Sequence, residues 1–475
     1  MGLEKNKQMV SITVLNKRKI SEPASFEYED FTNYMEMNSY LGYFNLIKKL
    51  DVVLAPSSEL PLFIGNCEFM NINYFFNYLL RSTSMSVKLS ESIFAGGKGF
   101  TVYKAICSSL GEAFERLMAC LEYFVQKENI EIGTYKMLKE KGLTPIHPND
   151  LRSFSDEQFL DENLLFDVFD EDTFTSWIKM IEMSSGTEVY IPACLILMYY
   201  KPKSKNEKRI GYATSGGLTS HYLEDKGIQH GLMEIIERHE INLSWYCKIQ
   251  PEEIIIDDSE DPQLRKYMNY ITEKNIRFFR HNVDQQNFHV ITAMSFDDDM
   301  TKYSFNTGGG ISPSIERAIL SSLEEYTQAV NNTRKIVYAP NWLTSSYSNG
   351  VLDVNEDDDP KNFKTFYQAV SYYGLKRNQH KLDWFVKDNP KRLLSEIRET
   401  ETRLNILEYI KKHNIEPYIA RLDIGKQFKN IYISKVFMKE FTPAFIAGVP
   451  MFGHKKYNQY LHKDVEMNRE ILPFP

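Results

Sequence analysis

Apolar residues recur at intervals of three and four between Ile106 and Phe124, which is the period of a helix with one face packed on a core. The glycine-rich segment 96–99 comes directly before this run. We therefore predict a glycine turn that leads into an amphipathic helix. The opposite flank of that helix carries the following polar side chains: Ser108, Glu112, Glu115 and Arg116.

The same arrangement occurs twice more, at 214–246 and 307–330. Fifteen residues separate Gly97 from Glu112, and the same interval separates Gly310 from Glu325; the second copy has a small insertion. A polar residue stands four positions before each first glutamate, which places both on one helix face. The second copy contains His230, Glu234, Glu237 and Arg238, and the third contains Ser321, Glu325 and Gln328.

Carboxylates grouped from several helices are the oxygen ligands that suit Mg²⁺, which prefers a few acids together with phosphate oxygens. Glycine turns at helix starts offer backbone N–H groups to anions, and a neighbouring arginine can bind phosphate with two hydrogen bonds. The repeats therefore indicate a magnesium–nucleotide site, although no Walker A sequence is present. A single motif of this kind is a solvated helix face in most proteins. Duplication of a purely structural module is a second alternative, because it would also produce three matching motifs.

Elsewhere helices and strands are interspersed without regular alternation, which predicts an α+β fold with mixed, largely antiparallel sheets and packed helices. We expect an accessory region at 1–85 and a nucleotide-binding domain at 86–475. The strands that we expect are at 189–200, 276–279, 289–296, 418–424 and 431–438, and a helix is expected at 392–412.

The composition is that of a globular protein, with 43% hydrophobic residues and a formal net charge of −8. This charge argues against nucleic-acid binding, which needs clustered Lys and Arg. The five cysteines are scattered and form no Cys-x-x-Cys pair, so they indicate neither a disulfide framework nor a zinc site. We expect a cytoplasmic protein without a membrane segment, because the N-terminus lacks a signal-peptide pattern and the apolar runs are short.

The three motifs resemble the nucleotide-binding motifs of the YcaO family, from about residue 90 to the C-terminus. The segments that carry the resemblance are Ser108–Arg116, Glu234–Arg238 and Glu325–Gln328, each behind its glycine-rich run. The resemblance implies two sets of residues around one site. The Mg²⁺ ligands would be Glu112, Glu115, Glu234, Glu237, Glu325 and Gln328, and the ATP contacts would be Lys98, Ser108, Glu112, Arg116, His230, Arg238 and Gln328.

The chain ends in Ile-Leu-Pro-Phe-Pro, and its two prolines favour an extended segment. In azoline-forming YcaO enzymes a proline-rich C-terminus ends in the active site, where its carboxylate assists proton transfer. The resemblance implies this role for Pro475, with Pro473 beside it. Ile471 stands where a third proline would complete the pattern, and a frayed end is the alternative interpretation.

The resemblance implies ATP-dependent cyclodehydration of Cys, Ser or Thr in a ribosomally made precursor peptide, giving thiazolines or oxazolines as in bacteriocin biosynthesis. It also implies a separate protein that binds the leader peptide, since a chain of this length leaves no room for that domain, and a flavin-dependent azoline dehydrogenase. Two alternatives stay open, namely thioamide formation and a non-enzymatic accessory role. The sequence does not decide whether the chain forms a homodimer.

Overall fold

The computed structural model describes the following ranges of the chain: 47–54, 59–69, 94–125, 127–198, 200–284, 287–297, 304–338, 354–355, 357–363, 366–422 and 431–474. Most of the accessory region expected at 1–85 lies outside these ranges, and its boundary stays a prediction. The chain divides into two compact units. The smaller unit comprises Met1–Met118, Ser220–Glu224 and Asp423–Ile433, and the larger unit comprises Ala119–Thr219, Asp225–Leu422 and Ser434–Pro475.

The smaller unit contains a three-stranded antiparallel sheet in the order β1-β2-β3. Its elements are β1 (Ile47–Leu54), β2 (Phe63–Phe69), β3 (Phe94–Gly99) and the first part of α3 (Val102–Val125). Leu110, Phe114 and Leu117 of α3 are buried, as the apolar period predicts. The helix therefore packs with its apolar face inward.

The first sheet of the larger unit has the order β11-β10-β9-β8-β12, in which β12 runs parallel to β8 and the other neighbours are antiparallel. Its strands are β8 (Glu252–Ile255), β9 (Arg277–His281), β10 (His289–Phe296), β11 (Phe305–Ser312) and β12 (Lys391–Leu393). The helix α7 (Ile315–Tyr338) packs along β11 and β10.

A second sheet has the order β4-β5-β13-β14-β7, and β6 pairs with β5 beside this path. Its strands are β4 (Ile130–Gly133), β5 (Thr175–Glu182), β6 (Glu188–Pro192), β7 (Leu218–His221), β13 (Pro417–Arg421) and β14 (Tyr432–Met438). The predicted α+β class with largely antiparallel sheets is confirmed.

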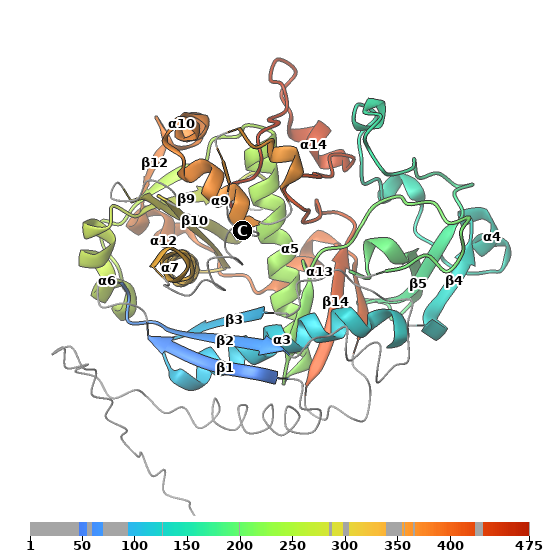
Figure 1. Cartoon of the computed structure of the whole chain (residues 1–475), viewed down its shortest axis with the longest axis horizontal. Coiled ribbons are helices and arrows are strands. Elements are labelled where there is room, and N and C mark those ends of the chain that lie inside the picture. Colours follow the sequence, from blue (N-terminus) through green and yellow to red (C-terminus); the bar gives the residue numbers. More distant parts are fainter. Residues whose placement is uncertain are drawn as a thin grey trace, which may run out of the picture. The chain divides into compact units, whose positions relative to one another are not determined.

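The long helix α5 (Glu224–Tyr246) runs beside β14 in the larger unit (Figure 1). The other α-helices within the described ranges are α4 (Tyr135–Glu140), α6 (Pro262–Glu273), α9 (Phe366–Gly374), α10 (Lys376–Gln379), α11 (Asp383–Val386), α12 (Leu394–Thr400), α13 (Ile406–His413) and α14 (Lys455–Tyr460). Short 3₁₀ turns lie at 127–129, 148–150, 158–160, 193–195, 360–362 and 380–382.

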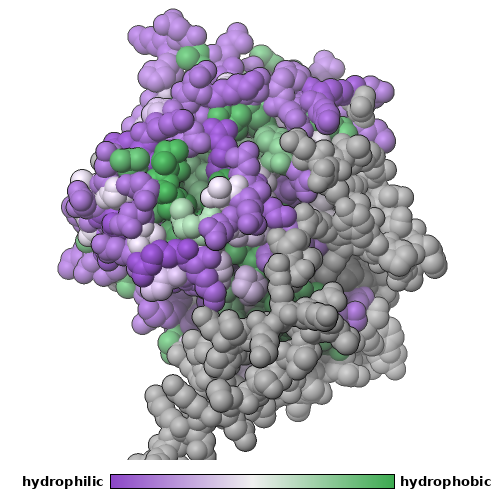
Figure 2. Space-filling view, turned by 90° about the vertical axis from the view of Figure 1, so that its left-hand side faces the viewer, coloured by the Kyte–Doolittle hydropathy of each residue, from purple (hydrophilic) through white to green (hydrophobic). Residues whose placement is uncertain are grey.

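The main core of the larger unit surrounds the C-terminal end of α5. Trp245 is fully buried there and contacts Trp384, Phe385 and Phe474, with ring centroids 5.2, 5.7 and 6.0 Å away. Such aromatic contacts add to the free energy of burying the rings. Among the residues that the structure describes, most large hydrophobic side chains are buried, and the coloured part of the face in Figure 2 is largely hydrophilic, with hydrophobic side chains between the hydrophilic ones.

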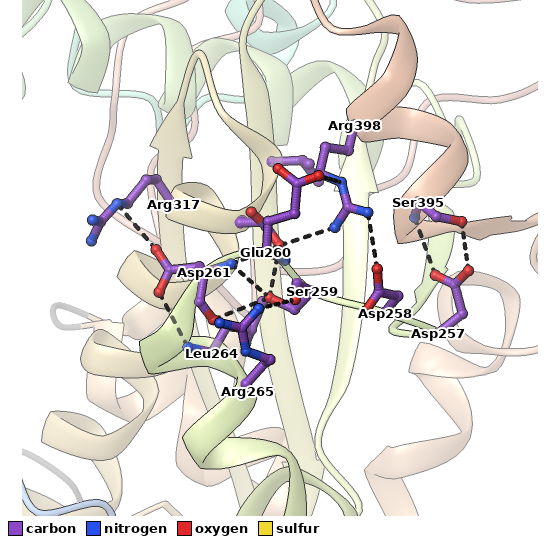
Figure 3. Close-up of polar contacts among 12 residues, drawn as sticks. Asp257, Asp258, Ser259, Glu260, Asp261, Leu264, Arg265, Arg317, Ser395 and Arg398 are labelled. Atoms are coloured by element: carbon purple, nitrogen blue, oxygen red, sulfur yellow. Dashed lines mark hydrogen bonds and ion pairs between the residues drawn. The ribbon is translucent and has the colours of Figure 1, made fainter.

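The acidic turn before α6 fixes the start of α7 (Figure 3). The buried Glu316 carboxylate, in the first turn of α7, accepts hydrogen bonds from the Ser259 hydroxyl and the Glu260 N–H, both 2.7 Å long. Arg398 of α12 lies 3.4 Å from Glu316 and also pairs with Asp258 at 3.1 Å. This network holds α12 against the helix that carries Glu325.

Two of the expected elements differ from the structure. The strand expected at 189–200 is wrong in extent, because β6 ends at Pro192, which has no N–H to donate, and the chain turns into a 3₁₀ helix. The single helix expected at 392–412 is also wrong. It is divided into β12, α12 and α13, because Asn405 and Glu408 form a capping box that starts a new helix.

The glycine turn predicted before the first and third helices is wrong as well. Gly97 lies within β3 and Gly310 lies within β11, and neither needs a positive φ angle. Only the second copy has the predicted turn, at Gly217, where φ is +75°. In the other two copies, the glycines instead allow the helix to pack closely on its strand.

We predict that Glu316→Ala lowers the free energy of unfolding by about 2 kcal/mol, since it leaves the buried Ser259 hydroxyl and the Glu260 N–H without their acceptor. Chemical denaturation measures this change. Glu399→Ala on the exposed side of α12 is the control and should shift the value by no more than about 0.5 kcal/mol. Equal effects of the two substitutions would contradict the role given to Glu316.

Candidate functional site

The first glutamate of each motif accepts a hydrogen bond from a glycine N–H on the segment before its helix. Gly96 N lies 2.8 Å from Glu112 Oε2, and Gly309 N lies 2.7 Å from Glu325 Oε2; in both, the acceptor comes 16 positions after the donor in the sequence. In the second motif Gly217 N donates to Glu234 at 3.0 Å. One carboxylate oxygen of each motif is therefore fixed by the backbone.

Close contact between helix and strand makes this hydrogen bond possible. A Cβ atom on Gly97 would lie 2.1 Å from the backbone nitrogen of Ser109, and one on Gly310 would lie 2.5 Å from that of Ser322. No side chain can occupy either position without moving the helix. Glycine is needed here because the two backbones touch, so the first and third motifs share the same packing as well as the same spacing.

The second motif is held differently. Lys435 of β14 is buried, and its ammonium group donates to the carbonyl oxygens of Thr214 and Gly216, both at 2.7 Å. The Val436 N–H also donates to Gly217 O at 2.8 Å. These contacts fix the turn whose N–H binds Glu234. Sequence reasoning missed Lys435, although a lysine in an otherwise apolar strand was an available signal.

Glu237 of α5 and Glu325 of α7 meet at Gly309. A Cβ atom on Gly309 would lie 2.6 Å from Glu237 Oε1 and 3.2 Å from Glu325 Oε2, so the missing side chain leaves room for both carboxylates. Two half-buried carboxylates from different helices, one of them anchored by the backbone, are a donor set that fits Mg²⁺. Within the described ranges, no group of three or more His, Cys, Asp or Glu side chains is close enough to hold a metal ion.

The acids of the first motif belong to the smaller unit. Glu112 Oε1 accepts from Arg116 Nε at 2.9 Å, and Glu115 Oε1 accepts from the Ser220 N–H at 2.8 Å. Ser220 also donates through its hydroxyl to Gly111 O. Glu115 is thereby held by the backbone in the same manner as Glu112.

The other predicted residues lie as follows. Ser108 and His230 are exposed on α3 and α5, whereas Lys98 on β3 and Gln328 on α7 are half-buried. Arg238 lines a cavity of about 80 Å³ with Lys435 and Tyr212, and neither Glu234 nor Glu237 lines it. The structure thus joins Glu237 with Glu325 and Glu112 with Arg116, and the role of Arg238 stays a prediction.

The C-terminal segment is built into the core of the larger unit. Pro473 and Phe474 are buried, and the Phe474 ring lies 4.9 Å from that of Phe385. Ile471 O accepts a hydrogen bond of 2.6 Å from the buried Tyr373 hydroxyl. The end is therefore not frayed up to Phe474. Pro475 lies outside the described residues.

A buried network of side chains that the sequence analysis did not predict holds α5 in place close to Glu237. His239 Nε2 lies 3.0 Å from Asp284 Oδ2, and Lys456 Nζ lies 2.8 Å from the same oxygen. Burial acts to raise the pKa of Asp284, but hydrogen bonds from His239, Lys456 and Tyr460 hold it well below its usual value. Asp284 is therefore ionised and anchors α5 to α14.

Comparison with known proteins identifies the fold. Similar solved structures include YcaO from Methanopyrus kandleri bound with AMPPCP and Mg²⁺, at 15% identity and a TM-score of 0.57, covering 90% of this chain and 94% of that chain. A heterocyclase in complex with substrate and cofactor matches at 16% identity and a TM-score of 0.63, over 95% of this chain and 59% of that one. The E. coli microcin synthetase McbBCD complex with pro-MccB17 bound matches at 15% identity and a TM-score of 0.58, over 90% and 96%.

No curated protein matches the sequence. No helix among the described residues has the length and apolar character needed to cross a membrane. The family model described as YcaO cyclodehydratase, ATP- and Mg²⁺-binding, matches residues 96–438, which confirms the predicted cofactors, ATP and Mg²⁺. Since this match covers most of the chain, the protein belongs to the YcaO cyclodehydratase family.

Proposed function

We propose that the protein catalyses ATP-dependent cyclodehydration of Cys, Ser or Thr residues in a ribosomally synthesised precursor peptide. The observation that carries this proposal is the meeting of Glu237 and Glu325 at Gly309, with one carboxylate held by a backbone N–H. Family membership and the likeness to heterocyclase structures support an azoline-forming reaction. The substrate peptide and the chemical steps are our inference.

The proposal assigns the acids of all three motifs to Mg²⁺. When bound, Mg²⁺ would neutralise charge on the phosphates of ATP. The ligands are Glu112, Glu115, Glu234, Glu237, Glu325 and Gln328, and further ATP contacts come from Lys98, Ser108, Arg116, His230 and Arg238. Because a glycine N–H fixes one oxygen of Glu112, Glu234 and Glu325, little reorganisation is needed on binding.

The proposed reaction begins when the sulfur or oxygen of a substrate side chain attacks the carbonyl carbon of the preceding residue, while its proton passes to a base. The resulting oxyanion accepts the γ-phosphoryl group of ATP, and ADP leaves. The amide nitrogen then loses its proton as the C–O bond to phosphate breaks, which leaves a C=N bond. The products are one azoline ring, ADP and inorganic phosphate.

The C-terminal segment supports a role for the tail in proton transfer. Hydrogen bonds to the backbone oxygens of Glu470 and Ile471, from Trp245 and Tyr373, fix the path of the chain towards its end. A rigid buried path suits a group that must reach one position repeatedly. We propose the Pro475 carboxylate as the base or acid, with Pro473 restricting the chain.

The proposal includes partner proteins. The microcin synthetase that resembles this chain is a multi-protein complex, and one of its structures has pro-MccB17 bound. By analogy we propose a separate protein that captures the leader of the precursor peptide, and a flavin-dependent dehydrogenase that acts on the azoline product. Thioamide formation and an accessory role are the competing functions that the following assay separates.

We predict that incubation with ATP, Mg²⁺, the precursor peptide and the leader-binding partner lowers the mass of the peptide by one water per modified residue. Mass spectrometry of the peptide checks this outcome. A mass gain that matches replacement of oxygen by sulfur would instead identify thioamide formation. An unchanged mass with a competent peptide and partner would point to the accessory role.

We predict that Glu237→Gln lowers the rate of cyclodehydration at least about 100-fold, because it removes one charge from the carboxylate pair without changing side-chain size. Asp225→Asn, on the exposed first turn of the same helix, is the matched control and should keep nearly full activity. Both rates are read from the mass of the peptide. Full activity of Glu237→Gln would refute the metal assignment.

We predict that Gly309→Ala lowers activity while the fold stays stable, since its Cβ would meet the flexible ends of Glu237 and Glu325 and displace them. Gly308→Ala provides the contrast, because its Cβ would lie 2.1 Å from the backbone nitrogen of Tyr326 and should destabilise the packing of α7 on β11. Thermal unfolding and the peptide mass assay together distinguish the two. A normal rate for folded Gly309→Ala would contradict the proposed site.

A further inference from the structure

A second polar cavity, of about 870 Å³, lies in the larger unit. It is bordered by β9 and β10, by the segment from α12 to α13, and by the start of α14. Its volume is in the range of about 300–1,000 Å³ that ligand pockets usually have. None of the residues assigned above to ATP, Mg²⁺ or proton transfer lines it.

The cavity lies on one face of the five-stranded sheet. Arg280 pairs with Ile291, so Arg280 and His289 point to the same face, because side chains alternate along a strand. His281 points to the opposite face, where its ring contacts Phe474. The cavity is thus separated by the sheet from the buried C-terminal segment.

Positive charge exceeds negative charge in the lining of the cavity. The cationic residues are Arg280, Arg392, Lys412, Lys455 and Lys456, with His289 and His413, and the acidic residues are Glu252, Asp284, Glu401 and Glu440. Burial raises the pKa of Glu440, which favours its neutral form, and burial lowers the pKa of His289 to about 3.

Three acids of the lining, Glu252, Asp284 and Glu401, are already engaged in ion pairs, whereas, among the described residues, the cation Lys412 is not. Glu252 lies between Arg280, at 2.9 Å, and Arg392, at 3.9 Å, so one carboxylate is shared by two guanidinium groups. Lys412 forms no ion pair with any residue that the structure describes. An anion would complete this arrangement.

Three buried polar atoms of the lining have no hydrogen-bond partner among the described residues, namely Arg280 Nε, His289 Nδ1 and Glu440 Oε2. The side chains of Arg280 and His289 are only 10% and 4% exposed. His289 Nε2 lies 3.4 Å from Glu401 Oε2; when it carries the proton, Nδ1 is an acceptor. Buried polar atoms without a partner are costly, which points to a ligand that supplies both an acceptor and donors.

We propose that this cavity binds an acidic segment of a peptide, and, given the function proposed above, that the peptide is the precursor substrate. A side-chain carboxylate would accept from Arg280 Nε and lie near Arg392 and Lys412. Backbone N–H groups of the same segment would donate to His289 Nδ1 and Glu440 Oε2. A phosphate ion has fewer hydrogen-bond donors than a peptide segment, and it would leave most of the cavity volume unfilled.

Binding of fluorescein-labelled hexaglutamate tests this proposal, with hexaglutamine as the uncharged probe and fluorescence anisotropy as the measurement. We expect hexaglutamate to bind the full chain and hexaglutamine to bind at least about tenfold more weakly. Lys412→Glu should weaken hexaglutamate binding at least about fivefold, since it reverses a charge at the cavity. Lys411→Glu, also in the exposed last turn of α13 but outside the lining, is the matched control and should change binding less than twofold.

Equal binding of the two probes, or equal effects of Lys411→Glu and Lys412→Glu, would overturn the proposal. Displacement of hexaglutamate by an equimolar amount of inorganic phosphate would also overturn it and identify a site for small anions. The assay contains no ATP and no partner protein. If hexaglutamate does not bind, the proposed cyclodehydration is therefore not contradicted. If the mass assay fails, the measured binding of hexaglutamate is not contradicted.

Discussion

The candidate site depends on one interaction, the hydrogen bond from a glycine N–H to the first glutamate of the helix that follows. For Gly96 and Gly309 it forms only because the helix lies directly on its strand, at a distance that excludes any Cβ at Gly97 and Gly310. A charged acceptor makes this a stronger bond than one between neutral groups. The close packing of the helix on its strand therefore also determines where the carboxylate lies. The constant spacing between glycine and glutamate in the motifs reflects this requirement.

The sequence was sufficient for the fold class, for the long helices that carry the acids, and for strand β10, because periodicity and spacing are local properties. It failed where tertiary contacts decide. Gly97 and Gly310 looked like turn residues, yet they are strand residues that accommodate a neighbouring helix. Lys435 and Asp284 were missed because they have partners that are distant in the sequence: Thr214 lies 221 residues from Lys435, and Lys456 lies 172 residues from Asp284.

The helix α5 connects the parts of the larger unit. Its middle carries Glu234 and Glu237, His239 on the following turn contacts Asp284, and Trp245 near its C-terminal end packs against Phe474. A fully buried aromatic core resists displacement, since removing such a ring costs about 3–5 kcal/mol. The position of the glutamates and the path of the C-terminal segment are consequently set by the same rigid element.

The peptide cavity and α7 are also physically linked. The Ile315 N–H at the start of α7 donates to Glu401 Oε2 at 2.9 Å, and the same oxygen lies 3.4 Å from His289 Nε2 in the cavity lining. Glu325 lies further along this helix, beside the edge strand β11. A ligand that moves Glu401 would therefore alter the hydrogen bond that anchors the start of α7, because one carboxylate oxygen serves both contacts.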